Sequence, residues 1–204
     1  PDVRLARRLL CMPVGDCERG VAEAAREDGI SLTGMTRIPW LNTHGHFALP
    51  EEAAPVVPLL QRAFELLGGD EEEQRNKRLR PLHNDLFHKA TNTMVEVDEL
   101  QHFTSYRLRT MEFVKDRWST AEFDTYNSHC ASLKNRADRY RASKVGKGFP
   151  GENSRSRQRA YNDLLRDLVP HCLGMRILRI PAPGLNGVEA YRASRERVRF
   201  LLSH

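Results

Sequence analysis

The chain has 204 residues, of which 40% are hydrophobic and 29% are charged, and its formal net charge is +5. This length holds one full hydrophobic core, and this composition is that of a globular protein and not of a disordered one. No stretch approaches the roughly 18 consecutive apolar residues of a membrane span, and the first residues lack the apolar core of a secretory signal. The sequence therefore predicts a cytoplasmic protein with no membrane partner.

Charge is distributed unevenly along the chain. Residues 134–204 contain 16 Lys and Arg against 6 Asp and Glu, whereas residues 1–133 contain 16 basic and 21 acidic residues. A basic C-terminal third beside an acidic remainder is typical of a protein that grips a polyanion next to a metal ion. Arginine also accumulates on solvated helix faces, so the pattern equally fits an ordinary surface.

The first 50 residues are predicted to form a small N-terminal extension. Residues 16–28 have a helical pattern, and residues 31–47 are interrupted by Gly, Pro and Trp. His44 and His46 flank a glycine, but two histidines without a third ligand nearby favour polar loop groups over a metal site. The four cysteines show no Cys-x-x-Cys spacing, which indicates free thiols.

The middle of the chain is predicted to hold one amphipathic helix and two strands. The helix covers residues 51–67, because apolar residues recur there at helical spacing before a Gly-Gly pair. Residues 70–78 are expected to be an exposed, charged connector. Strands are expected at about 79–88 and 93–98, with a turn between them.

The later part of the chain is predicted to be mainly helical, with one further strand. Helices are expected at 104–118, 123–141, 156–168 and 187–203, and the strand is expected at 175–180. The Gly- and Lys-rich segment 143–155 lacks the phosphate-binding P-loop pattern and is expected to be a mobile basic loop. This order of elements predicts a mixed α/β sheet flanked by helices.

Three acids mark the first candidate site. Glu96 and Asp98 alternate along the strand 93–98, so both carboxylates project from the same face. Asp85 lies in the preceding predicted strand. Acids that converge from neighbouring strands form an oxygen-rich pocket for a divalent ion, an arrangement that suits phosphodiester hydrolysis. The alternative is that these acids form the solvated face of an antiparallel hairpin.

The order of these residues resembles that of a known family. Asp85, then Glu96-Val97-Asp98 and His102, are followed by Arg166-Asp167-Leu168 and by Gly174-Met175-Arg176-Ile177-Leu178-Arg179-Ile180. This series resembles the PD-(D/E)XK nuclease superfamily, nearest to its very-short-patch repair endonuclease-like branch, over roughly residues 51–182. The motifs are short, and it is their joint order that carries the resemblance.

The resemblance implies both a fold and a function. The fold would be a restriction-endonuclease-like mixed β-sheet core flanked by α-helices over residues 51–204, with residues 1–50 as an extension of unknown role. The function would be metal-dependent endonucleolytic hydrolysis of phosphodiester bonds, with DNA as the expected partner, in repair, restriction or defence against mobile elements.

The resemblance also implies roles for individual residues. Asp85 and Glu96 would bind Mg²⁺ (or Mn²⁺), with Asp98 as a further ligand or an outer-shell carboxylate. His102 would act as general base or protonate the leaving oxygen, since an unperturbed pKa of about 6.5 permits either; alternatively it caps the next helix. Position 98 is Asp where the superfamily has Lys, so Gln101 or His102 would have to take over the role of that Lys in orienting water.

Basic residues mark the second candidate site, a nucleic-acid-binding surface. The predicted residues are Arg107, Arg109, Lys144, Lys147, Arg155, Arg157, Arg159 and Tyr161. Clustered arginines can hold phosphates, and a tyrosine can stack on an exposed base. The alternative is a solvated helix with pairs within it, such as Arg159 with Asp163.

Three hypotheses follow from the sequence. The first is a metal-dependent nuclease, and the second is a catalytically inactive nuclease-fold protein that binds nucleic acid or a partner protein. The third is an unrelated α/β module in which the acids coincide by chance. The sequence leaves open whether the protein forms a homodimer or binds a protein partner.

Overall fold

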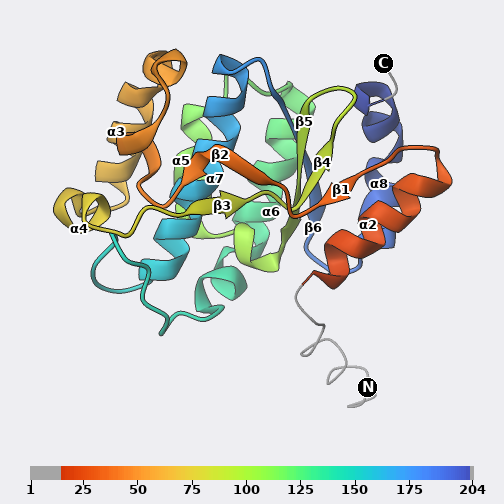
Figure 1. The fold of residues 1–204 in the computed structure, drawn as a ribbon. Helices are drawn as coiled ribbons and strands as arrows, with labels where there is room; N and C mark the ends of the chain where they lie inside the picture. Colours follow the sequence, from red (N-terminus) through yellow and green to blue (C-terminus); the bar gives the residue numbers. More distant parts are fainter. Residues whose placement is uncertain (1–14, 203–204) are drawn as a thin grey trace. The chain divides into compact units, whose positions relative to one another are not determined.

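The computed structural model describes residues 15–202, which form a mixed α/β protein with two compact units (Figure 1). The first, here called the sheet unit, comprises residues 15–36, 84–99 and 178–202 of the described chain. The second, here called the helical unit, comprises residues 37–83 and 100–177. No helix of the described residues is both long and apolar enough to cross a membrane.

Four strands in the order β1-β4-β5-β6 form the main sheet. These strands are β1 (Thr33–Gly34), β4 (Leu86–His88), β5 (Thr93–Glu99) and β6 (Arg176–Ala182). β1 pairs antiparallel with β4, and β4 pairs antiparallel with β5, with Leu86 opposite Val95. The predicted strands at 93–98 and 175–180 are confirmed as β5 and β6.

The predicted strand at 79–88 is divided in the structure. Its first part is β3 (Pro81–His83), which pairs antiparallel with β2 (Arg37–Asn42) in a separate two-stranded sheet, and its second part is β4. Between them the Asn84 side-chain amide donates to the backbone oxygen of Leu86. Such side-chain bonds to the local backbone compete with strand pairing, which explains the break.

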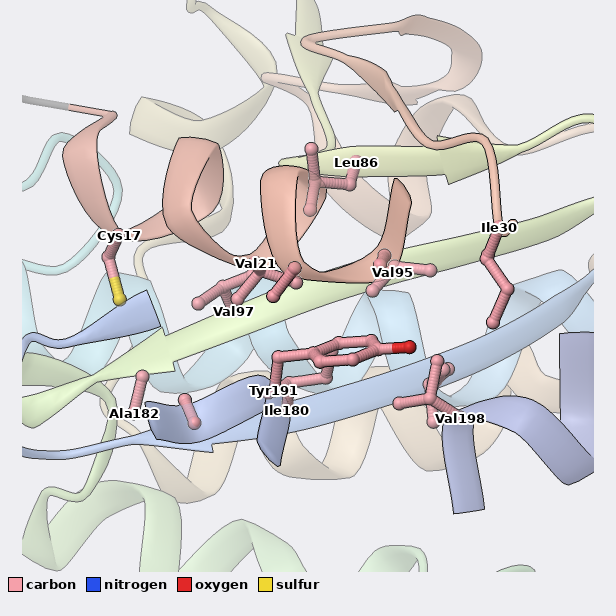
Figure 2. Close-up of a cluster of buried hydrophobic side chains, with 14 of the residues drawn as sticks. Cys17, Val21, Ile30, Leu86, Val95, Val97, Ile180, Ala182, Tyr191 and Val198 are labelled. Carbon is pink, nitrogen blue, oxygen red and sulfur yellow. The ribbon is translucent and has the colours of Figure 1, made fainter. Parts of the chain in front are cut away.

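Two helices, α2 (Asp16–Glu27) and α8 (Gly187–Leu202), contact each other and cover one face of the sheet in the sheet unit. Figure 2 shows Val21 of α2 and Tyr191 of α8 among the buried side chains of β4, β5 and β6. A Cβ on Gly187 would lie 1.9 Å from the backbone oxygen of Cys17. Only glycine therefore allows the two helices to approach this closely.

The N-terminal region is not a separate extension in this structure. Helix α2 and strand β1 belong to the sheet unit, and residues 37–50 belong to the helical unit. The structure therefore does not divide at residue 50, where the sequence predicted a boundary. Pro50 precedes the 3-10 helix Glu51–Val56 and does not lie at the edge of a compact unit.

The helical unit is built mainly from helices and short 3-10 turns. In chain order, its helical elements are η1 (Gly45–Ala48), η2 (Glu51–Val56), α3 (Val57–Leu66), α4 (Glu71–Arg75), η3 (Leu100–His102), α5 (Ser105–Thr110), η4 (Met111–Phe113), α6 (Thr120–Arg139) and α7 (Ser154–Cys172). The predicted helix at 51–67 is η2 followed by α3, and proline explains the change. Pro55 lacks the N–H that an α-helix interior needs, whereas a proline in the first turn of α3 is tolerated.

The connector at 70–78 was predicted to be solvent-exposed, and this is wrong for its centre. Glu73 donates its backbone N–H to the side chain of Asp70, which caps α4. Gln74 is 2% exposed and donates its side-chain amide to the backbone oxygen of Thr43. The polar sequence of this segment therefore does not reveal that Gln74 is buried and holds the connector to Thr43.

The two long helices of the helical unit begin at polar residues. The Ser119 side chain accepts from the Glu122 backbone N–H, and Glu122 accepts in return from the Ser119 backbone, which is the capping box that starts α6. Helix α7 begins after Asn153 and includes Pro170 near its end. It is therefore longer than the predicted helix at 156–168.

Candidate functional site

The two faces of β5 have different environments. Val95 and Val97 belong to the buried cluster beneath α2 and α8, as Figure 2 shows. Side chains alternate along a strand, so Glu96 and Asp98 project from the opposite face. Both are buried, at 3% and 1% exposure. The predicted common face is confirmed, and the alternative of a solvated hairpin face is wrong.

Asp98 forms a buried ion pair with Arg179 of β6. One guanidinium nitrogen, Nη1, lies 2.8 Å from Oδ1 and 2.9 Å from Oδ2 of Asp98. Arg179 stands between Leu178 and Ile180, which both belong to the core on the α2 side, so its side chain projects from the Asp98 face. The structure thus holds a guanidinium group against the carboxylate of Asp98.

Asp85 lies at the start of β4 and binds the backbone of β5. Its Oδ2 accepts a hydrogen bond of 2.9 Å from the Val97 backbone N–H. Because Leu86 pairs with Val95, one further step of the antiparallel register places Asp85 opposite Glu96. Asp85 and Glu96 are therefore opposite each other along the backbones of the two segments.

The sequence predicted that three acids would meet around one cation. Within the described part of the sheet unit, no three His, Cys, Asp or Glu side chains bring one ligand atom each within 4.8 Å of one another. The acids instead differ in their contacts, because the Asp85 carboxylate accepts from the Val97 backbone N–H while Asp98 holds Arg179. Mg²⁺ is commonly bound by one or two carboxylates with water and phosphate oxygens, so Asp85 and Glu96 are the residues of this segment that could hold the ion.

His102 and Gln101 lie in η3, which follows β5 directly in the chain and belongs to the helical unit. The Nδ1 atom of His102 is 3.0 Å from Oδ2 of Asp163 in α7. A carboxylate at Nδ1 fixes the orientation and the tautomer of an imidazole. The alternative that His102 caps the next helix is wrong, because the cap of α5 is the Thr104 side chain.

Gln101 contributes its backbone to the helical unit. Its carbonyl oxygen accepts a hydrogen bond of 3.2 Å from Nη1 of Arg159, and its side chain is half-buried. The prediction that the Gln101 side chain orients a water stays a prediction.

Two of the predicted nucleic-acid-binding residues are buried. Tyr161 is 0% exposed, and its hydroxyl contacts the ring and the backbone N–H of His46. Arg107 is 1% exposed and forms an ion pair of 2.7 Å with Asp167. Neither side chain can reach a nucleic acid, so both predictions are wrong. Tyr161 follows the helical spacing that was used to place it, but the face concerned is turned inward.

Arg157 is half-buried and stabilises backbone turns. Its guanidinium donates to the carbonyl oxygens of Leu67 at 3.0 Å and Phe149 at 3.3 Å, and also to that of Pro150. These contacts join two loops of the helical unit to α7. A structural role explains Arg157 without a nucleic acid.

The other predicted basic residues remain available at the surface of the helical unit. Arg109, Lys144, Lys147 and Arg155 are exposed, and Arg159 is half-buried. Their contact with a nucleic acid stays a prediction. Arg109 also donates to the backbone oxygen of Leu66 at 3.1 Å.

The histidine pair at 44 and 46 consists of structural groups, as the sequence favoured. The Nε2 atom of His44 is 2.6 Å from the backbone oxygen of Lys77. His46 is 6% exposed and contacts the side chains of Tyr161 and Gln61, and its burial lowers its pKa. Both rings have protein partners that explain their position.

The thiol of Cys17 on the α2 face lies among acids. Burial, together with the charges of Glu99, Glu18 and Asp85, raises the pKa of Cys17 to about 12. The thiol therefore stays protonated at neutral pH. Cys17 and Cys172 are free thiols, as the spacing of the cysteines indicated, and Cys11 lies outside the described residues.

Sequence reasoning missed two partners of the candidate residues: Arg179, which pairs with Asp98, and Asp163, which contacts His102. A single arginine within the apolar run Ile177-Leu178-Arg179-Ile180 was a signal, because a buried cation in a strand needs an acid beside it. Asp163 was interpreted as a partner of Arg159 within one helix, four residues away. Its distance from His102 along the chain concealed their contact.

Comparisons with known proteins complete the description of the site. A family model described as a family of unknown function (DUF7255) matches residues 62–183, a span that includes Asp85, Glu96, Asp98 and Arg179. Searches of curated proteins and of solved structures find no match. The resemblance to PD-(D/E)XK nucleases stays a prediction. Because the matched residues make up more than half of the chain, this protein belongs to the family of unknown function DUF7255.

Proposed function

We propose that the protein is a metal-dependent endonuclease that hydrolyses phosphodiester bonds in DNA, with a restriction-endonuclease-like core. The observation that carries this proposal is the arrangement on β4, β5 and β6: Asp85 beside Glu96, and next to them a buried Arg179 held by Asp98. Two hard oxygen ligands and one fixed cation are the chemical groups that phosphodiester hydrolysis with Mg²⁺ requires.

Each residue has a distinct role in this proposal. Asp85 and Glu96 would hold Mg²⁺ or Mn²⁺, which supplies Lewis-acid polarisation of the phosphate and a bound water of lowered pKa. Arg179 is too buried to touch the phosphate, so it would replace the missing motif Lys only by placing a positive charge beside the metal ligands, and it cannot act as a base because arginine does not lose its proton.

His102, in the helical unit, keeps in this proposal the role in proton transfer that the sequence predicts for it. The Asp163 carboxylate on its Nδ1 orients the ring and leaves Nε2 as the reactive nitrogen. An imidazole can accept a proton from water or donate one to a leaving oxygen. This role is that of a general base or acid.

The second candidate function is a nuclease fold that only binds nucleic acid or a partner protein. The Asp98–Arg179 ion pair favours it, because a carboxylate engaged by a buried guanidinium is a poorer metal ligand. In that case the acids would be structural, and the exposed cations of the helical unit would carry the function.

A cleavage assay with matched variants tests the proposal. Glu96→Gln should lower Mg²⁺- or Mn²⁺-dependent cleavage about 10³-fold or more, because a metal ion contributes several kcal/mol to the transition state. Glu99→Gln is the control, since it is the same change on the same strand but at a position of the opposite face. Single-stranded, duplex, mismatched and branched DNA should be tested, with RNA as a further substrate.

The outcomes separate the two candidate functions. Cleavage by the wild type and by Glu99→Gln, but not by Glu96→Gln, supports the endonuclease. Binding of DNA without cleavage of any substrate by the wild type supports the inactive fold. Equal cleavage by Glu96→Gln and the wild type would overturn the assignment of the site.

A further inference from the structure

Five cations of the helical unit gather around the start of α7. This group, here called the cation cluster, consists of Lys77, Arg141, Lys147, Arg155 and Arg159. Only three of these residues were predicted from the sequence to contact nucleic acid. They come from three segments: the end of the α4 connector, the loop between α6 and α7, and α7 itself.

The charges of the cation cluster are close enough to repel one another. Burial lowers the pKa of Lys77 to about 8, and repulsion from Lys147 and Arg155 adds to this effect against the attraction of Glu73. Burial likewise lowers the pKa of Arg159, with repulsion from Arg155 and Arg141. Repulsion between like charges held this close destabilises the folded protein, and a bound anion would remove this repulsion.

The acids around the cation cluster have other partners. Glu73 accepts a hydrogen bond of 2.8 Å from the Gly148 backbone N–H, and Asp163 contacts His102. Asp163 also attracts Arg155 and Arg159. Glu73 and Asp163 are the acids whose charges act on Lys77, Arg155 and Arg159, and both also hold other groups of the helical unit.

Backbone contacts fix the loop that carries the cluster. The Gly148 carbonyl accepts from the Asp70 N–H at 2.9 Å, and the Lys147 carbonyl accepts from the Gln158 side chain at 2.9 Å. Gly148 has a φ of 84°, and a Cβ there would lie 2.7 Å from Nζ of Lys77. The segment that the sequence predicted to be a mobile loop is therefore held against α4 and α7.

An exposed aromatic ring lies within the cluster. Tyr140 follows α6, is 36% exposed, and has the guanidinium carbons of Arg141 at 5.3 Å and Arg159 at 6.0 Å from its ring centre. Arg141 adopts a left-handed backbone with a φ of 51°, which is unfavourable for a non-glycine residue and often marks a functional site. The fold thus holds one ring and two guanidinium groups together at the surface.

We propose that Tyr140 and the cation cluster bind an unpaired stretch of nucleic acid, with one base stacked on the Tyr140 ring and the flanking phosphates on the cations. This inference deepens the proposed function by naming its substrate class. A base can replace one guanidinium against the ring, and the released guanidinium can pair with the adjacent phosphate. Tyr140 thereby takes the role that the sequence assigned to Tyr161.

The combination favours unpaired nucleic acid over other polyanions. Stacking on an aromatic ring requires a flat partner. Lipid headgroups have no flat ring, and an acidic peptide has one only where it contains an aromatic residue. In a duplex the base faces are covered by neighbouring bases, so a surface ring can stack only on a base that is unpaired or displaced. Cations without base-edge contacts also predict weak sequence preference.

Fluorescence anisotropy in EDTA tests the proposal without cleavage. Labelled single-stranded DNA, single-stranded RNA and duplex DNA of one sequence are titrated with the full chain. We expect an unpaired strand to bind more tightly than duplex, and Tyr140→Ala to weaken that binding about tenfold, since base stacking contributes roughly 1–3 kcal/mol. Tyr140→Phe keeps the ring and should bind within about twofold of the wild type.

Two further variants complete the design. Phe200→Ala removes a ring that is 74% exposed and lies in α8 of the sheet unit. It is therefore the control for the loss of an exposed aromatic ring outside the cation cluster. Arg155→Ala should reduce by about one the slope of log affinity against log salt, as expected for one lost phosphate contact.

The outcomes are decisive in both directions. Tighter binding of DNA or RNA single strands, with loss in Tyr140→Ala but not in Phe200→Ala, supports the proposal whichever sugar is preferred. Duplex binding as tight as single-strand binding, or unchanged binding by Tyr140→Ala, would overturn it. The binding assay contains no free metal ion, so a failure of this site and a failure of the metal site give different results.

Discussion

The two units bury the same kind of ion pair and differ in what surrounds it. In the sheet unit, Arg179 holds Asp98 at 2.8 Å, and in the helical unit Arg107 holds Asp167 at 2.7 Å, with every side chain at 2% exposure or less. Glu96 shares the strand face of Asp98, and Asp85 lies opposite Glu96 across the strands. Arg107 instead lies between helix α7 and the Trp118 ring, 5.6 Å from its centre.

This difference indicates which pair is structural and which belongs to a site. A guanidinium between packed helices neutralises one carboxylate and joins two elements. A guanidinium beside several carboxylates on one strand face lies in a place where a divalent cation could also bind. Burial and distance alone would not have separated the two pairs.

The largest expected effect comes from breaking each pair. Arg107→Met and Arg179→Met should each lower the free energy of unfolding by about 3–5 kcal/mol in EDTA, because each leaves a buried carboxylate without its guanidinium. Urea denaturation followed by circular dichroism measures both. A loss below about 1 kcal/mol for Arg107→Met would contradict its structural role.

Manganese should then separate the two variants. In Arg179→Met the site loses a positive charge beside Glu96, so Mn²⁺ should bind more tightly and raise the melting temperature more than it does in Arg107→Met. Thermal denaturation with and without Mn²⁺ measures this shift. Equal shifts in the two variants would show that Arg179 is as remote from any metal as Arg107 is.

A smaller effect tests the assignment of α2 to the sheet unit. Gly187→Ala should lower the free energy of unfolding by about 1–3 kcal/mol, because the added methyl group would lie 1.9 Å from the Cys17 backbone oxygen and push α8 away from α2. Gly184→Ala is the control, since a Cβ there has no atom within 4 Å. Equal stability of the two variants would mean that α2 does not pack on α8.

The smallest effect concerns Lys77 in the helical unit. Its pKa is about 8 in the folded protein and 10.5 in an unfolded chain. Between these values the unfolded chain binds a proton that the folded protein does not, so stability rises with pH in this window. The wild type should gain less than about 1 kcal/mol relative to Lys77→Met from pH 8 to 10, because solvent screens the part-exposed ammonium. A relative loss would contradict the lowered pKa.

The strands and most helices follow from the sequence because their signals are local. The alternation of Val95, Glu96, Val97 and Asp98 is enough to place two valines in a core and two acids on the other face. The helix at 51–67 and the strand at 79–88 were predicted to be longer than they are, because Pro55 and Asn84 interrupt them locally.

The partners of the acids could not be obtained in the same way. Arg179 is 81 residues from Asp98, and Asp163 is 61 residues from His102, so both contacts depend on the tertiary fold. Helical spacing also cannot tell which face of a helix is buried, so it did not distinguish the buried Tyr161 from the exposed Tyr140. The division at residue 50 failed for a related reason, since a unit can be built from segments that are distant in the sequence.

Calorimetric titration with Mn²⁺ tests most directly whether Asp85 and Glu96 form a cation site. The account predicts one site in the wild type and in Glu99→Gln, and binding at least about tenfold weaker in Glu96→Gln. Absence of Mn²⁺ binding by the folded wild type, or equal binding by Glu96→Gln, would contradict it.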